Sequence, residues 1–165
     1  MFAQTAAKTA VDADAVFARV KTLAGSWEER STKGWTAGDK IRVIARGTGV
    51  LFESSFTGEP DEGMATVFYV DKGRLLLTHY CEAGNQPTLV ATSASADGNT
   101  ITFEFLSGTG MKSREDGHMD KLLLKFLSPD TYSEQWTWYK AGKEQWMEEI
   151  VCRRVPKQPS ATAGR

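Results

Sequence analysis

The stretch Arg74–Pro87, RLLLTHYCEAGNQP, decides how the rest of the chain is interpreted. Its first half has the apolar and β-branched composition of a strand, and Gly84 ends that pattern. Side chains of a strand alternate between two faces, and the face that carries Thr78 and Glu82 is the more polar one. We therefore expect His79, on the other face, to point into the interior of the protein.

The second of the two histidines in the chain begins another such run. His118 shares the phase of Leu122 and Leu124, which alternate with Lys121 and Lys125. It is therefore also expected to face inward. Two inward histidines indicate a binding cavity, although they do not name its ligand.

The same strand pattern recurs along most of the chain. Ten strands are expected, at residues 26–32, 40–47, 49–57, 64–70, 74–82, 88–96, 100–106, 118–127, 131–140 and 143–155. No helical pattern separates them, so neighbouring strands must be antiparallel. One short amphipathic helix is expected before them, over Asp12–Ala24, with Val16, Val20 and Leu23 on its apolar stripe and Gly25 as its stop signal.

Short and long connections alternate between these strands, which indicates an up-and-down order. The tight turns are at 47–49, 71–73, 97–99 and 128–130, and the longer joints are at 33–39, 58–63, 83–87 and 107–117. The long loops should gather at one end. Closing the meander would remove its exposed edges, and ten strands leave room for a cavity. The predicted fold is an all-β, ten-stranded antiparallel up-and-down barrel with a short N-terminal helix, formed by residues 12–155, with disordered segments at 1–11 and 156–165.

The candidate ligand-binding residues lie near the long-loop end of the predicted barrel. The polar candidates are His79, His118, Glu53 and Asn85, and the apolar ones are Phe103, Phe105, Leu124, Trp136 and Trp138. Each has a simpler alternative: a histidine bonded to a loop carbonyl, an asparagine that satisfies its own turn, or an aromatic core. The loop Ser107–Asp116 is either a lid over the cavity or an ordinary surface loop.

Composition disfavours several classes of partner. The 165 residues carry a formal net charge of −1, and the Lys and Arg residues are not clustered, so nucleic acid is not an expected partner. No apolar run approaches the roughly 20 residues that span a bilayer, so stable membrane insertion is not expected. Cys81 and Cys152 match no zinc pattern and are expected to be free thiols.

The first residues, MFAQTAA, resemble the small-residue region around a signal cleavage site. They favour a periplasmic or secreted protein, and a cytoplasmic location is the alternative.

Several short motifs together resemble those of a known group of proteins. They are Gly25-Ser26-Trp27 after a short helix, LTHYCEAGNQP at 77–87, ITFEF at 101–105, GHMD at 117–120 and QWTW at 135–138. With these motifs the chain resembles, over about residues 16–155, a bacterial family of uncharacterised lipocalin-like (calycin-type) barrels, often exported. The resemblance implies a barrel that binds a small ligand. More distantly, the chain is similar to nitrobindin-type barrels, which hold haem through a histidine near the chain end; residues 146–155 contain no histidine, so haem is not expected.

The favoured function is non-enzymatic binding or carriage of a small, largely apolar ligand, with no cofactor. The first alternative is a hydrolase or isomerase that uses His79 and His118 at the barrel mouth, where His79 with Glu53 or Glu134 could act as acid and base. A metal site would combine the same histidines with Asp120 or Cys81. A further alternative is a partner-binding protein whose interior is filled by its own side chains.

Overall fold

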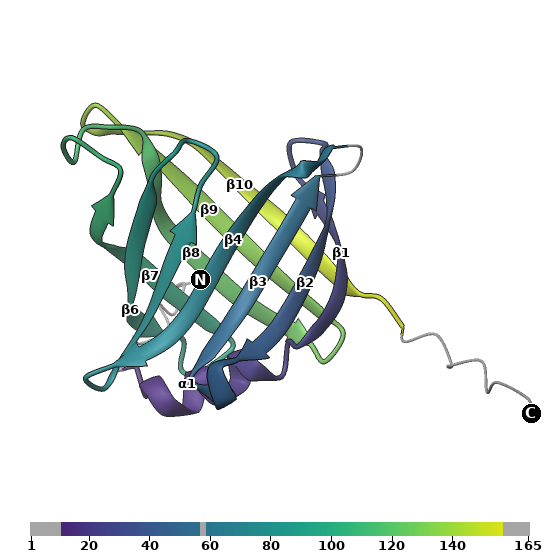
Figure 1. The fold of residues 1–165 in the computed structure, drawn as a ribbon. Coiled ribbons are helices and arrows are strands. Elements are labelled where there is room, and N and C mark those ends of the chain that lie inside the picture. The colour runs from purple at the N-terminus through teal and green to yellow at the C-terminus, as the bar shows by residue number, and fades with distance from the viewer. Residues whose placement is uncertain (1–10, 57–58, 157–165) are drawn as a thin grey trace, which may run out of the picture.

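In the computed structural model, which describes residues 11–56 and 59–156, the chain forms a closed antiparallel barrel of ten strands (Figure 1). Each strand pairs with its neighbours in sequence, and the first strand pairs with the last. The strands are β1 (Gly25–Ser31), β2 (Thr36–Ile44), β3 (Gly49–Phe56), β4 (Glu59–Asp71), β5 (Arg74–Tyr80), β6 (Gln86–Ala94), β7 (Thr100–Thr109), β8 (His118–Ser128), β9 (Thr131–Lys140) and β10 (Lys143–Arg154). The fold predicted from the sequence is therefore confirmed.

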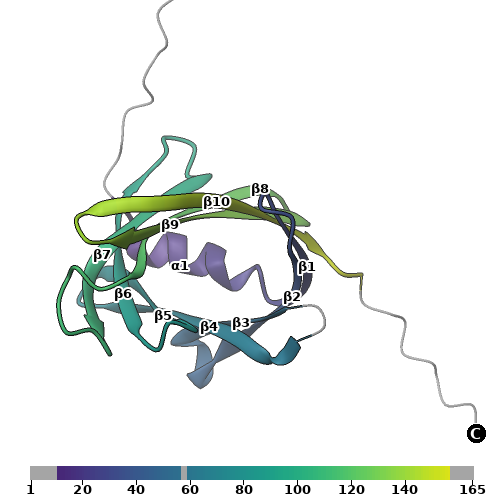
Figure 2. The same ribbon diagram turned by 90° about the horizontal axis from the view of Figure 1, so that it is seen from above.

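The helix α1 (Ala13–Lys21) closes one end of the barrel, which Figure 2 shows from the opposite, open end. Asp12 caps it by accepting a hydrogen bond from the backbone N–H of Ala15. Phe17 and Val20 are buried against the barrel, whereas Val16, expected on the apolar stripe, is only partly buried. The helix also ends at Lys21, earlier than the predicted Ala24.

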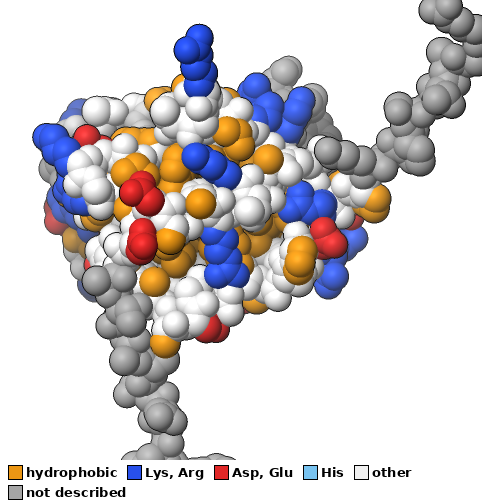
Figure 3. All heavy atoms as spheres, turned by 90° about the horizontal axis from the view of Figure 1, so that it is seen from below, with side chains coloured by type: hydrophobic (Ala, Val, Ile, Leu, Met, Phe, Trp, Pro, Cys, Tyr) orange, Lys and Arg blue, Asp and Glu red, His pale blue; other side chains and the backbone are white. Residues whose placement is uncertain are grey.

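Arg154, at the end of β10, joins three parts of the closed end. Its guanidinium donates to the carbonyls of Ala24 and Pro129 and lies 4.1 Å from the centre of the Trp27 ring. The indole N–H of Trp27 donates to the carbonyl of Leu23, at 2.8 Å. Trp27 is 1% exposed and packs edge-on against Tyr132 at this end. On the outer surface here, apolar side chains lie in small groups between Lys and Arg side chains (Figure 3).

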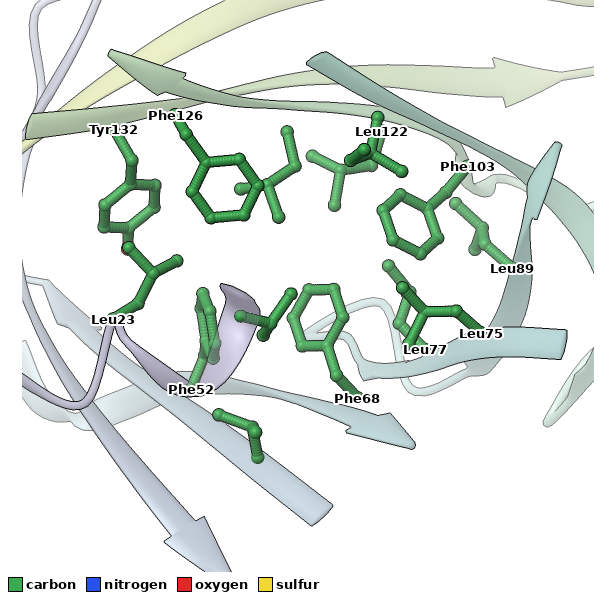
Figure 4. Packing of buried hydrophobic residues seen from close by; sticks show 14 of the residues in the cluster. Leu23, Phe52, Phe68, Leu75, Leu77, Leu89, Phe103, Leu122, Phe126 and Tyr132 are labelled. Carbon is green, nitrogen blue, oxygen red and sulfur yellow. The ribbon is translucent and has the colours of Figure 1, made fainter. Parts of the chain in front are cut away.

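The lower part of the barrel is filled by apolar side chains that point inward from all sides (Figure 4). Phe52 lies 4.8 Å from Phe68, measured between ring centres, and Phe68 lies 5.7 Å from Phe103. Tyr132 extends this aromatic group toward Trp27. Any cavity must therefore lie above this packed layer, toward the open end.

Successive connections alternate between the two ends of the barrel, but the expected contrast between short and long connections is weaker than predicted, because several strands are longer. The turns predicted as tight lie at the helix end, where Arg19 donates to the carbonyl of Gly98, whereas the short connections at 57–58 and 141–142 lie at the open end. At the open end β2 begins at Thr36, β4 at Glu59 and β7 ends at Thr109, so the predicted loops at 33–39, 58–63 and 107–117 are shorter. A 3-10 turn at Ala45–Gly47 follows β2.

Residues 1–10 and 157–165, which make up nearly all of the two segments expected to be disordered, lie outside the described residues. Within the described residues, no helix has the length and apolar character needed to cross a membrane.

Candidate functional site

A small cavity of about 50 Å³ lies between the packed layer and the open end of the barrel. Its walls combine aromatic and methionine side chains with four acidic side chains and one histidine. The lining residues are Glu29, Trp35, Asp39, Phe52, Ser54, Met64, Thr66, His79, Met119, Glu134, Trp136, Glu148 and Ile150. Strand alternation explains this set, because most of these residues share the phase of a buried apolar residue two positions away.

His79 is one of two described side chains at this cavity that the fold leaves incompletely bonded. Its Nδ1 lies 2.9 Å from the hydroxyl of Thr66, the residue directly opposite on β4. Its ring lies 4.9 Å from that of Trp136, and the side chain is 4% exposed. The other nitrogen, Nε2, is buried and has no hydrogen-bond partner. Burial lowers the pKa of His79 to about 4, so the ring is neutral at pH 7.

Each of the four acidic side chains accepts a hydrogen bond from a neighbouring side chain. Ser54 donates to Glu29 at 2.9 Å, and the hydroxyl of Tyr132 donates to Oδ2 of Asp39 at 2.8 Å. The indole N–H of Trp136 donates to Glu134 at 2.7 Å, and that of Trp35 donates to Glu148 at 2.9 Å. Oδ1 of Asp39 is buried without a partner.

Three of these carboxyl groups are difficult to ionise together. Burial, followed by the charges of Glu29 and Glu134, raises the pKa of Asp39 from 3.8 to about 8. Burial and the charge of Glu29 raise the pKa of Glu134 to about 7, and burial raises the pKa of Glu29 itself. The cavity is therefore partly protonated near neutral pH, with its charge shared among the three groups.

The residues present do not fit a haem, and they form no recognisable metal site. Ordinary small-molecule sites enclose about 300–1,000 Å³, far more than this cavity, and haem is larger than most ligands of such sites. Among the described residues, no group of three or more His, Cys, Asp or Glu is arranged to hold a metal ion. Both Cys81 and Cys152 are free thiols, as expected.

His118 is fully buried, but it does not lie at the cavity wall as predicted. A β-bulge between Met119 and Lys121 shifts the phase of β8, so that Met119 takes the inward position and His118 lies opposite Tyr139. Arg114 donates to Nε2 of His118, which leaves Nδ1–H to donate to the carbonyl of Asp116 at 2.6 Å. Both ring nitrogens are therefore used by protein groups, and His118 does not line the cavity.

As a result of the bulge in β8, the two histidines have different surroundings. His79 contacts Thr66 and Trp136, whereas His118 contacts Phe105 and Tyr139, with ring centres 4.6 and 5.5 Å away. The two histidines therefore do not meet at the mouth, and of the acid and base pairs considered for the enzyme alternative only His79 and Glu134 line the same cavity.

Two other polar candidates also lie away from the cavity. Glu53 points to the outer face, where it is 44% exposed and pairs with Arg42 at 2.7 Å, because the adjacent Phe52 and Ser54 take the inward positions. Asn85 is buried, and its amide donates to the carbonyl of Gly117 at 2.7 Å. It therefore joins two loops of the open end, which differs from both the ligand contact and the bond within its own turn that were considered for this residue.

The apolar candidates divide between the cavity and its surroundings. Trp136 lines the cavity as expected. Phe103 and Leu124 are fully buried in the packed core and do not line it. Phe105 is half-buried beneath the guanidinium of Arg114, 4.4 Å away, and Trp138 is half-buried against the core. The apolar wall expected from Phe103, Phe105 and Leu124 is instead formed by other residues, including Phe52, Met64 and Met119.

Of the four acidic residues of the cavity, sequence reasoning named only Glu134, as a possible acid or base beside His79. The spacing in the sequence indicated that they face inward: Glu29 lies two residues after Trp27, Asp39 two before Ile41, and Glu134 between Tyr132 and Trp136. Each has the phase of a buried side chain, although a charged residue in a strand is ordinarily assigned to the solvent face.

Comparison with known proteins supports the fold and leaves the family open. No family model and no curated protein matches the chain. The structure is similar to that of Rv2717c from M. tuberculosis, with 16% identity, a TM-score of 0.58, and coverage of 90% of this chain and 100% of that one. It is also similar to NPUN_R4044 of Nostoc punctiforme PCC 73102, a protein of unknown function from the DUF3598 family, with 11% identity, a TM-score of 0.54 and 82% of this chain covered. The chain spans 49% of that second protein. Such identities show a shared barrel fold, and the lipocalin-like family expected from the motifs stays a prediction.

Proposed function

We propose that the protein binds a small ligand, without catalysis, in the cavity at the open end of the barrel. The observation that carries this proposal is Nε2 of His79, a buried ring nitrogen without a partner at the cavity wall. Leaving such a group unpaired costs about 1–3 kcal/mol. A ligand that bonds to it would recover this free energy, while Trp136 and Met119 contact its apolar part.

The cavity limits the size of this ligand. One water-sized sphere needs about 10–15 Å³, so a cavity of about 50 Å³ accepts roughly five non-hydrogen atoms unless its side chains move. With at most about 1.5 kcal/mol per atom, the binding free energy reaches about 7 kcal/mol, or a Kd near 10 μM. The flexible side chains of Met64 and Met119 are the parts of the wall that could make room for a larger apolar ligand.

Native mass spectrometry and NMR test the proposal together. The purified chain is analysed before and after solvent extraction, and is then titrated with a panel of small metabolites while the ring nitrogens of both histidines are followed. A bound ligand should shift the Nε2 resonance of His79 and leave that of His118 nearly unchanged, because only His79 lines the cavity.

Two variants show whether the binding occurs in the cavity. His79→Ala removes the unpartnered nitrogen and should abolish the ligand-induced shifts of the Trp136 indole. Glu53→Gln, on the outer face, is the matched control and should bind normally. A chain that carries no small molecule and takes up none from the panel would refute the proposal.

A further inference from the structure

We propose that the ligand of this cavity is a small organic cation of the alkylammonium class, held by Asp39, Glu29 and Glu134 against the indole rings of Trp35 and Trp136. This inference rests on the proposed function, and it adds the charge of the ligand. The ammonium group would lie among the carboxylates, and its alkyl part would contact the aromatic and methionine side chains.

The first argument is the uncompensated charge of the cavity. Glu29, Asp39 and Glu134 reach it from β1, β2 and β9, and no Lys or Arg is among the described residues that line it. Buried carboxylates are ordinarily paired with a cation, because desolvating an unpaired charge is costly. Here the hydrogen bonds from Ser54, Tyr132 and Trp136 satisfy single oxygens but bring no positive charge.

Among the described residues that line the cavity, two polar atoms have no partner: Nε2 of His79 and Oδ1 of Asp39, in side chains that are 4% and 5% exposed. His79 lies outside the acidic cluster, so its nitrogen is a separate indication of a ligand. When Asp39 is ionised, its Oδ1 only accepts hydrogen bonds, so the partner that it then lacks is a donor. An ammonium group has several N–H donors, one of which would satisfy Asp39. When the hydroxyl of Thr66 accepts from Nδ1 of His79, Nε2 is an acceptor as well.

The aromatic walls favour the same ligand. The indole N–H of Trp35 donates to Glu148, and that of Trp136 donates to Glu134. An aromatic ring therefore lies beside each of these two carboxylates. The face of an indole attracts a cation, and most strongly where water is excluded. Carboxylates and indoles at one cavity thus favour a cation over a neutral molecule of the same shape.

Binding of a cation should be linked to loss of protons from the cavity. The titratable groups that face it are Glu29, Asp39, Glu134, Glu148 and His79, with Tyr132 and Cys152 packed close to the acids. Because the pKa values of Asp39 and Glu134 are raised, a bound ammonium group should displace protons near neutral pH. Its affinity should rise with pH until the carboxyl groups are ionised.

Three probes of the same number of non-hydrogen atoms separate charge from shape: isopropylammonium, 2-propanol and acetate. Each is titrated into the full-length chain at about pH 8, and the indole N–H signals of Trp35 and Trp136 report binding. Isopropylammonium should bind at least about tenfold more tightly than 2-propanol, which corresponds to one charge-assisted hydrogen bond, and acetate should bind least. At about pH 5, where Asp39 and Glu134 are protonated, the preference for the cation should fall sharply.

Two variants assign the effect to the carboxylates. Asp39→Asn and Glu134→Gln each remove one charge while keeping an oxygen that can accept from Tyr132 or Trp136, and each should weaken isopropylammonium binding by about tenfold. The binding of 2-propanol should change little. Glu53→Gln removes a charge from the outer face and should affect neither probe.

The outcomes distinguish this inference from the proposed function. If 2-propanol or acetate binds as tightly as isopropylammonium, the cation assignment is overturned while ligand binding in the cavity stands. If no probe shifts the two indole signals and the metabolite panel is also negative, both proposals fail. An isopropylammonium affinity that Asp39→Asn and Glu134→Gln leave unchanged would also overturn the assignment.

Discussion

Replacing Asp39 by asparagine should stabilise the protein at alkaline pH. The buried carboxyl group of Asp39 faces Glu29 and Glu134 and has a pKa of about 8 in the folded protein, against 3.8 in an exposed chain. The folded protein therefore binds more protons than the unfolded chain between these two pH values. Stability falls as pH rises through this window, and the contribution of Asp39 is fully present only below about pH 4.

The size of the effect follows from the displacement of the pKa. About four pKa units at about 1.4 kcal/mol each give an upper limit of about 5 kcal/mol at pH 8. The effect is smaller than this limit because Glu29 and Glu134 can retain their own protons, which reduces the charge repulsion on Asp39. We therefore expect Asp39→Asn to raise the free energy of unfolding by about 2 kcal/mol at pH 8 and to leave it nearly unchanged at pH 4. The asparagine oxygen can still accept from Tyr132.

Urea unfolding of the wild type and the variant between about pH 4 and 9 measures this difference directly. Glu53→Gln, which removes an exposed carboxylate, is the control and should show no comparable pH dependence. An Asp39→Asn protein that is no more stable than the wild type at pH 8 would refute the account of the acidic cavity. A wild-type stability that increases from pH 7 to 9 would do the same.

Three further predictions concern other parts of the barrel. Burial lowers the pKa of His79 to about 4, so the free energy of unfolding should fall as pH falls from about 6.5 to 4. In thermal melts, the melting temperature of His79→Gln should fall less than that of the wild type over this pH range. Phe103→Ala should lower the free energy of unfolding by about 3–5 kcal/mol, because Phe103 is fully buried in the packed layer; urea midpoints measure this. Arg154→Ala removes the hydrogen bonds to Ala24 and Pro129, and hydrogen exchange in α1 should become faster while that in β6 stays slow.

The fold could be predicted because alternation and turn signals act locally. The strand at Arg74–Tyr80 shows this, since its alternating side chains and the turn before it lie within one short stretch. The open end was harder, because pairing with a neighbour extends β2 and β4 into residues such as Gly38 and Glu59 that carry no strong strand preference.

The site was predicted only in part, and β8 shows why. Alternation counted back from Leu122 gives His118 an inward position, but a single bulge residue reverses every side chain beyond it. The consecutive polar pair Asp120-Lys121 interrupts the alternation and was the available sign of that bulge. His79 has no bulge between it and the apolar residues of β5, so its expected inward position is confirmed.

The pairing of Trp27 with Arg154, which closes the ring of strands, also has a consequence for synthesis on the ribosome. These two residues are separated by nearly the whole barrel sequence, so β1 has to wait for its second neighbour until β10 has been translated. Until then the nascent chain exposes two strand edges and an open apolar interior, the state most prone to aggregate. Completion of the barrel should therefore be a late and slow event.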